Sequence, residues 1–155
     1  MKRLLLLPAL LSLLAVPLQA EVQTKPIDYR DGETELRGYL CWDDAVQGKR
    51  PGVLVVHEWW GLNDYARSRA EQLAKLGYVA FALDMYGPGK VTEHPQQAGE
   101  WASTIRSNTA AWVSRAVAGL KVLKDQEQVD TSRLAASGYG LGGSTRLQLA
   151  FAGGD

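Results

Sequence analysis

The chain has 155 residues, 17 of them basic and 17 acidic, so its formal net charge is zero. This length suits one domain of modest size, and no basic block favours nucleic-acid binding. The single cysteine, Cys41, cannot form a disulfide within the chain, and a sequence with only two histidines beside it offers no Cys/His zinc site.

Residues 1–20 have the layout of a secretory signal peptide. Two basic residues precede a leucine-rich stretch that ends at Ala20, before a polar segment. The alternative is a membrane anchor, but Pro8 and Pro17 interrupt a stretch that is shorter than the roughly 20 residues needed to span a bilayer. We therefore expect export, to the periplasm or the medium, with no stable membrane anchor. The mature domain, residues 21–155, would carry a net charge near −2, because the leader removes two basic residues and no acidic one.

The hydropathy pattern of the mature part predicts an antiparallel hairpin followed by buried strands. Residues 22–45 alternate around the turn Asp31-Gly32, as in a hairpin. Residues 53–56 are continuously apolar, which is typical of a strand covered on both faces, and residues 78–84 are similar. Residues 133–140 predict a third buried strand.

Helical patterns separate these strands. Asn63 is expected to cap a helix that runs to about Leu76 and ends at Gly77. Polar, helix-compatible sequence follows over residues 94–106, and a clearer helix is predicted over residues 109–124. A last helix begins near Gly142. The residues expected on the buried faces are Ala66, Ala70, Leu73, Ala74 and Leu76 in the first helix, and Val113, Ala116, Val117, Leu120 and Leu123 in the third.

This order of elements indicates an α/β fold, with a mostly parallel sheet, flanking helices and an N-terminal antiparallel hairpin. Three parallel strands alone would leave the strand at residues 133–140 without its outer neighbour. An exposed apolar edge of that kind invites self-association.

The glycine-rich segment GYGLGG, residues 138–143, joins that strand to the last helix and fits two motifs. As G-x-G-x-x-G it matches a dinucleotide-binding turn, in which glycines let a pyrophosphate approach a helix N-terminus. That fingerprint normally belongs to the first strand–helix unit of its domain, whereas two such units precede this one. Its acidic ribose-binding partner, roughly 20 residues on, would lie beyond Asp155.

The second motif is a nucleophile elbow, a sharp strand-to-helix turn that presents a nucleophile between two small residues. In this frame Gly138 and Gly142 are the flanking glycines and Gly140 is the apex. Glycine has no side chain, so the nucleophile position holds no competent nucleophile. Ser137 and Ser144 lie beside the turn, but neither is at its apex.

The segments HEWWGLNDYARSRAEQLAKLGYVAFALDMYG and VDTSRLAASGYGLGG resemble the dienelactone hydrolase family of α/β-hydrolases. The resemblance runs from about residue 25 to the end and implies an α/β-hydrolase fold that stops after the elbow helix, without its C-terminal half. The family has a cysteine where this chain has Gly140. It also uses an aspartate and a histidine from later in the fold, a region that Asp155 precedes.

The resemblance also implies roles for residues near the elbow. Glu58 matches the glutamate that contacts and poises the cysteine thiol, and the backbone amides of Trp59 and Leu141 match the oxyanion-hole donors. The implied activity is hydrolysis of a small-molecule ester or lactone by acyl transfer, with no metal or organic cofactor. The arginines that hold the substrate carboxylate in the best-known members have no clear counterpart here.

Two functional interpretations follow. As written, the chain lacks a nucleophile, so we expect a hydrolase-family protein with no measurable hydrolysis of its own. The alternative is a non-catalytic pseudoenzyme, or a fragment that binds a small apolar acid or a partner subunit.

Structural roles are expected for most other polar and aromatic residues. In α/β-hydrolases the catalytic histidine follows the nucleophile, so His57 is expected to pack or hydrogen-bond at the end of its strand. His94 is expected to be solvated, Asp84 to cap local backbone amides and Trp112 to pack in the core. For Trp59 and Trp60, pocket wall and core remain equally open.

Overall fold

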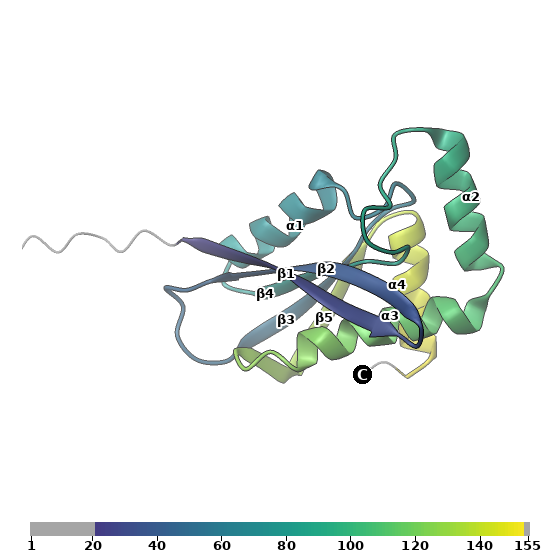
Figure 1. Cartoon of the computed structure of the whole chain (residues 1–155). Helices are drawn as coiled ribbons and strands as arrows, with labels where there is room; N and C mark the ends of the chain where they lie inside the picture. The colour runs from purple at the N-terminus through teal and green to yellow at the C-terminus, as the bar shows by residue number, and fades with distance from the viewer. Residues whose placement is uncertain (1–20, 154–155) are drawn as a thin grey trace, which may run out of the picture.

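The computed structural model describes residues 21–153. The expected signal peptide, residues 1–20, lies outside the described residues, as does Asp155. The elements in chain order are β1 (Val22–Asp31), β2 (Thr34–Asp43), β3 (Arg50–Val56), α1 (Asp64–Lys75), β4 (Val79–Leu83), α2 (Pro95–Arg106), α3 (Thr109–Lys124), β5 (Val129–Gly138) and α4 (Leu141–Phe151) (Figure 1).

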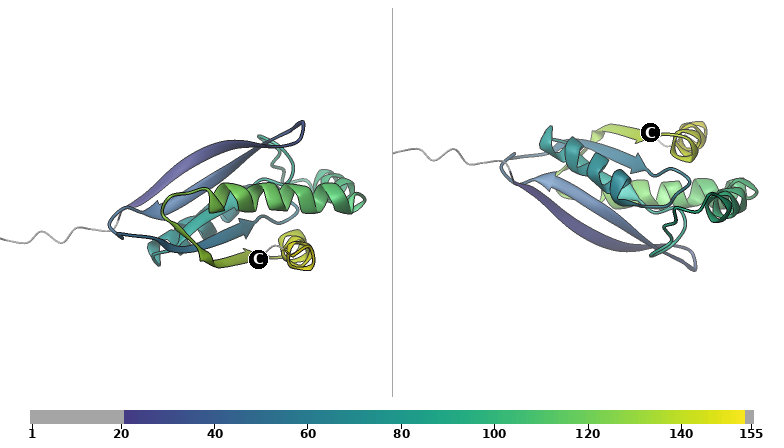
Figure 2. Two further views of the ribbon diagram at one scale, coloured as in Figure 1. Left: turned by 90° about the horizontal axis from the view of Figure 1, so that it is seen from below. Right: turned by 90° about the horizontal axis from the view of Figure 1, so that it is seen from above.

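The strands form one sheet in the order β1-β2-β4-β3-β5. The hairpin β1–β2 is antiparallel and joins the sheet through an antiparallel β2–β4 pair, whereas β4, β3 and β5 run parallel to one another. Helix α1 covers one face, and α3 and α4 cover the other, as the two views of Figure 2 show from opposite sides. The predicted α/β fold, with its N-terminal hairpin, is confirmed.

The continuous apolar runs in β3 and β4 supply two different cores. Leu54 and Val56 of β3 pack with Phe81 of β4 in the larger core, beneath α3 and α4. Val55, between them, faces the other way and packs with Ala80 and other small residues under α1. Successive side chains of a strand point to opposite faces, so a strand buried on both must be apolar at every position.

The third strand is present, but the prediction that it is buried is wrong. Strand β5 begins earlier, at Val129, and lies at the edge of the sheet, where Ala135 is exposed and Leu134 is half-buried. Its apolar composition suits a strand covered on both faces, but within the described residues it pairs only with β3.

The helix boundaries agree closely with the predictions. Two of the residues predicted to lie on buried helix faces are exposed instead. Asn63 caps α1, where its side chain accepts a hydrogen bond from the Ala66 N–H. Leu76 comes after the last turn of α1 and is 74% exposed, and Val117 of α3 is 44% exposed because Ala116 and Leu120 face the sheet instead. The hairpin turn lies at residues 32–33, one position later than expected. No helix among the described residues is long and apolar enough to cross a bilayer.

His57 ties together the ends of two neighbouring strands, as expected of a structural histidine. Its Nε2 accepts a hydrogen bond from the Met85 N–H just after β4, so Nε2 carries no proton, and Nδ1 donates to the Glu58 carbonyl. The ring is 1% exposed. Burial lowers the pKa of His57 below its ordinary value of 6.5, although the hydrogen bond to Glu58 and the nearby Asp84 charge oppose that shift.

This buried imidazole predicts loss of stability in mild acid. The unfolded chain takes up a proton at His57 near pH 6.5 and the folded chain only at lower pH, so the stabilisation is complete above pH 6.5 and is lost as the pH falls below it. We expect the free energy of unfolding in urea to fall between pH 7 and about pH 5.5. His57→Gln should remove this dependence. His94→Gln, at the chain's other and exposed histidine, should keep it. An unchanged pH dependence in His57→Gln would contradict the assignment.

Candidate active site

The loops that follow β3 and β5 meet at the carboxyl ends of these strands, because the two strands are neighbours and run parallel. Their pairing continues to Val56 opposite Gly138, the last residue of each strand. Glu58 follows β3 by two residues, and Gly140 follows β5 by two residues. Loops after the carboxyl ends of adjacent parallel strands form the usual binding crevice of an α/β sheet.

Gly140 has the backbone conformation of a sharp turn. Its φ is +54° and its ψ is −116°, and α4 begins at the next residue. The turn is closed by hydrogen bonds from the Gly142 N–H to the Tyr139 carbonyl, 2.8 Å, and from the Ser144 N–H to the Gly140 carbonyl, 3.1 Å. Residues with a Cβ rarely adopt a positive φ, so glycine relieves strain that another residue would carry here.

A side chain at position 140 would face Glu58. A Cβ placed on Gly140 meets no atom closer than the Glu58 Oε1, which is 4.0 Å away. The position is therefore open, and the carboxylate is its nearest neighbour. The fold thus brings together Glu58 and Gly140, which lie in segments far apart in the sequence.

The flanking glycines are required by the close approach of backbone to backbone. A Cβ on Gly142 would lie 2.3 Å from the Val56 carbonyl oxygen, and a Cβ on Gly138 would lie 2.7 Å from the Gly142 carbonyl carbon. Atoms this close cannot coexist, so neither position accepts a larger residue without moving α4.

Glu58 is half-buried at the mouth of this turn. Its carboxylate accepts no hydrogen bond from the described residues, whereas its backbone carbonyl accepts from the Gly61 N–H at 3.3 Å and from the His57 Nδ1. It lines a small hollow of about 20 Å³ with Gly138 and Tyr139 from the elbow and Tyr65 and Arg69 from α1. The carboxylate is therefore free to contact a group that enters between the two loops.

Two backbone N–H groups at the site have no acceptor among the described residues. Leu141 is the first residue of α4, and first-turn N–H groups have no partner within a helix. The Trp59 N–H lies in the other loop, next to Glu58, and finds no acceptor among the described residues. N–H donors without a partner can stabilise negative charge on a carbonyl oxygen when they converge on it.

The remaining polar residues near the site serve the fold. Asp84 is buried, and its Oδ1 accepts hydrogen bonds from the Tyr86 and Gly87 N–H groups, each 2.9 Å, as expected of a capping residue. Ser144 donates its hydroxyl to the Gly140 carbonyl. Cys41 is fully buried in β2, and burial raises the pKa of its thiol to about 12.

The aromatic residues separate into core and loop. Trp112 is buried, as predicted, and donates to the Thr145 hydroxyl at 2.6 Å. Trp59 and Trp60 are half-buried and pack on each other, with ring centroids 4.7 Å apart. Trp59 also contacts the main core, so of the two possibilities left open, this side chain belongs to the core margin.

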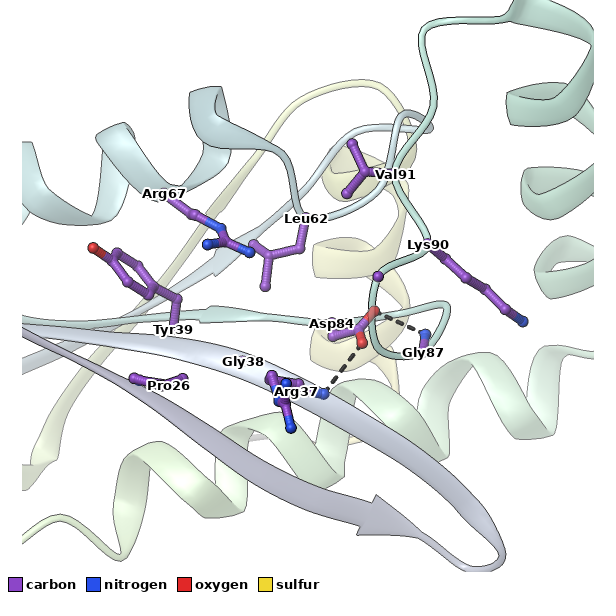
Figure 3. A pocket seen from close by; sticks show the side chains of 11 residues that line it. Pro26, Arg37, Gly38, Tyr39, Leu62, Arg67, Asp84, Gly87, Lys90 and Val91 are labelled. Carbon is purple, nitrogen blue, oxygen red and sulfur yellow. Dashed lines mark hydrogen bonds between the residues drawn. The ribbon is translucent and has the colours of Figure 1, made fainter.

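A larger pocket, of about 250 Å³, lies between the hairpin, the start of α1 and the loop after β4 (Figure 3). Two of its cations already have neighbours: Arg67 lies 5.4 Å from the centre of the Tyr39 ring, and Arg37 is paired with Asp28. No motif predicted this pocket, because its lining comes from segments far apart in the chain. Residues 21–153 contain no cluster of His, Cys, Asp or Glu that could hold a metal ion.

The chain is similar to known proteins in sequence and in fold. The sequence profile of the Dienelactone hydrolase family matches residues 36–155. Protein usf of Aquifex pyrophilus is 29% identical over 131 residues, which are 82% of this chain and 54% of that protein.

Two solved structures are more similar in sequence. The structure named m3DLH is 43% identical with a TM-score of 0.82, and a dienelactone hydrolase-like promiscuous phosphotriesterase from metagenomic libraries is 42% identical with a TM-score of 0.78. Each comparison covers 85% of this chain and 55% of the other, so the chain spans about half the length of these relatives. The matched region contains both the loop at Glu58 and the turn at Gly140, and the chain belongs to the dienelactone hydrolase family.

Proposed function

We propose that this chain carries a dienelactone hydrolase-type site for a small-molecule ester or lactone in which Gly140 replaces the nucleophile. The chain would then not perform acyl transfer by itself. One observation carries the proposal: the glycine at the apex has a φ of +54°, and the nearest atom to a Cβ built on it is the Glu58 Oε1. We also propose that the chain is exported, as expected from the sequence of residues 1–20.

The chemistry of the site supports a binding role without a covalent step. Acyl transfer begins when a nucleophile attacks the carbonyl carbon and negative charge develops on the carbonyl oxygen. The backbone N–H groups of Trp59 and Leu141 would serve that oxygen. With no side chain at position 140, however, no acyl-enzyme can form there, so the remaining groups can only bind and polarise a carbonyl.

The first prediction concerns turnover. With p-nitrophenyl acetate as substrate, we expect the release of p-nitrophenol by the chain to equal the buffer blank, since no nucleophile is present at the apex. The Glu58→Gln variant should give the same rate as the unmodified chain. Turnover above the blank that disappears in Glu58→Gln would contradict the proposal, because it would mean that the site acts without a nucleophilic side chain at position 140.

The second prediction restores a thiol. In Gly140→Cys we expect rapid reaction with an aromatic disulfide reagent under native conditions. The unmodified chain should react only when unfolded, because its one thiol, Cys41, is buried with a raised pKa. We also expect the free energy of unfolding to fall by about 1–3 kcal/mol, the strain of a positive φ in a residue with a Cβ.

Gly140→Ala is the matched control for this variant. It should lose a similar free energy of unfolding and gain no thiol reactivity. If the thiol at position 140 proves as slow to react as Cys41, the apex does not face an open cleft and the elbow assignment fails.

A second candidate function, self-association through the β5 edge, is favoured by a contrast between the two edges of the sheet. The outer strand β1 carries Lys25, Pro26 and Asp28, which are typical of an edge that is protected against further pairing. The last five residues of β5, Leu134–Gly138, carry neither charge nor proline. A hollow of about 210 Å³ lies beside them, between β5 and α4, and its lining is apolar except for Arg146.

This edge predicts concentration-dependent association. We expect size-exclusion chromatography with light scattering to give a mass that rises above the monomer as the concentration increases. Ala135→Lys should return the chain to the monomer, because a charged side chain on an exposed edge strand opposes strand addition. Thr24→Lys, on β1, should have no effect. A monomer at every concentration would exclude this function.

A further inference from the structure

A further cavity lies on the side of the molecule where α2 and α3 meet the loop after β4. It has a volume of about 410 Å³, and its lining includes Tyr86, Lys90, Trp101, Thr104, Ile105 and Arg115. This volume is in the range of about 300–1,000 Å³ that is usual for small-molecule sites. None of these residues lines the small hollow at Glu58, so the two are separate places.

The floor of this cavity is aromatic and apolar. Tyr86 and Ile105 are buried, and Trp101 packs on Tyr86 with ring centroids 5.6 Å apart. The Tyr86 hydroxyl donates to the Trp59 carbonyl at 3.2 Å, which holds the ring in place. Burial raises the pKa of Tyr86 to about 12, although the Arg106 charge opposes that shift, so the hydroxyl keeps its proton. Such a floor suits a flat, apolar ligand.

The charge at the cavity is entirely positive. Arg115 of α3 donates from Nη1 to the Met85 carbonyl at 2.7 Å, which fixes the guanidinium. Its Nε is buried and finds no acceptor among the described residues. The guanidinium is part of the lining of the cavity, where an anionic group of a ligand could pair with it.

Lys90 adds a second cation at the rim. Its side chain is directed away from the pocket drawn in Figure 3 and is exposed. The loop that carries it is fixed by hydrogen bonds from the Lys90 N–H to the Gly87 carbonyl and from the Val91 N–H to the Gly89 carbonyl. The lining of the cavity contains no acidic residue that would neutralise Lys90 and Arg115.

From this combination of an aromatic floor and two cations, we propose that the cavity is a binding site for a small aromatic carboxylate. The ring would lie against Tyr86 and Trp101, and the carboxylate would face Lys90 and Arg115. This site is independent of the proposed function, since it uses no residue of the elbow.

Titration calorimetry of the full chain with benzoate tests the proposal. We expect benzoate to bind, and neutral benzamide and aliphatic acetate to bind at least about tenfold more weakly, because each lacks one of the two features that the cavity recognises. Lys90→Gln should weaken benzoate binding about tenfold, the loss expected for a charge-assisted contact. Trp101→Leu should weaken it by about fivefold.

Matched variants separate this site from other places on the chain. Lys75→Gln removes an exposed lysine from α1 and should leave the affinity for benzoate unchanged. Glu58→Gln, in the loop after β3, should also leave it unchanged. Circular dichroism would establish that each variant is folded. The proposal is overturned if benzoate does not bind, if acetate binds equally well, or if Glu58→Gln changes the affinity while Lys90→Gln and Trp101→Leu do not.

Discussion

The candidate site depends on one close approach of backbone to backbone, where the first turn of α4 meets the end of β3. A Cβ on Gly142 would lie 2.3 Å from the Val56 carbonyl oxygen, so only glycine lets the helix begin there. Because β3 and β5 are paired up to Val56 and Gly138, this contact fixes where both following loops start. A larger residue at either flanking glycine would push α4 outward and separate the apex at Gly140 from the Glu58 carboxylate.

The sheet beneath this contact is held by two cores of different character. Large side chains fill the space between the sheet and the helices α3 and α4. On the opposite face most of the buried side chains are small, which lets α1 pack closely on the sheet. Buried polar residues then fix the carboxyl ends of the strands: His57 links the end of β3 to Met85, and Asp84 caps the loop after β4. These two residues have the chemistry of catalytic groups, but their hydrogen bonds are used up in holding the loops that carry the site.

With glycine at the apex, the chain forms the sharp turn of an elbow but has no side chain there to react. An elbow normally holds its nucleophile in a strained conformation, which costs stability in exchange for reactivity. Here the same turn is formed at a residue that carries little strain, and the carboxylate opposite has no side chain to meet. The positively charged cavity is linked to this region through the Tyr86 hydroxyl, which donates to the Trp59 carbonyl, and through the segment after Lys90, where the Thr92 N–H donates to the Trp60 carbonyl. The aromatic loop after β3 therefore contacts segments that form the cavity.

The sequence by itself determined the fold class, the boundaries of most helices and the sharp turn at Gly140 between β5 and α4, because periodicity, caps and glycine spacing are local signals. It also identified Glu58, although only through resemblance to the family. Local pattern could not give the exposure of β5, whose composition suits a covered strand, since burial depends on what lies beside a strand rather than on the strand itself. The distance between Glu58 and Gly140 and the cavity at Arg115 were decided by tertiary structure alone. Both join segments far apart in the chain, and only strand pairing and helix packing bring such segments together.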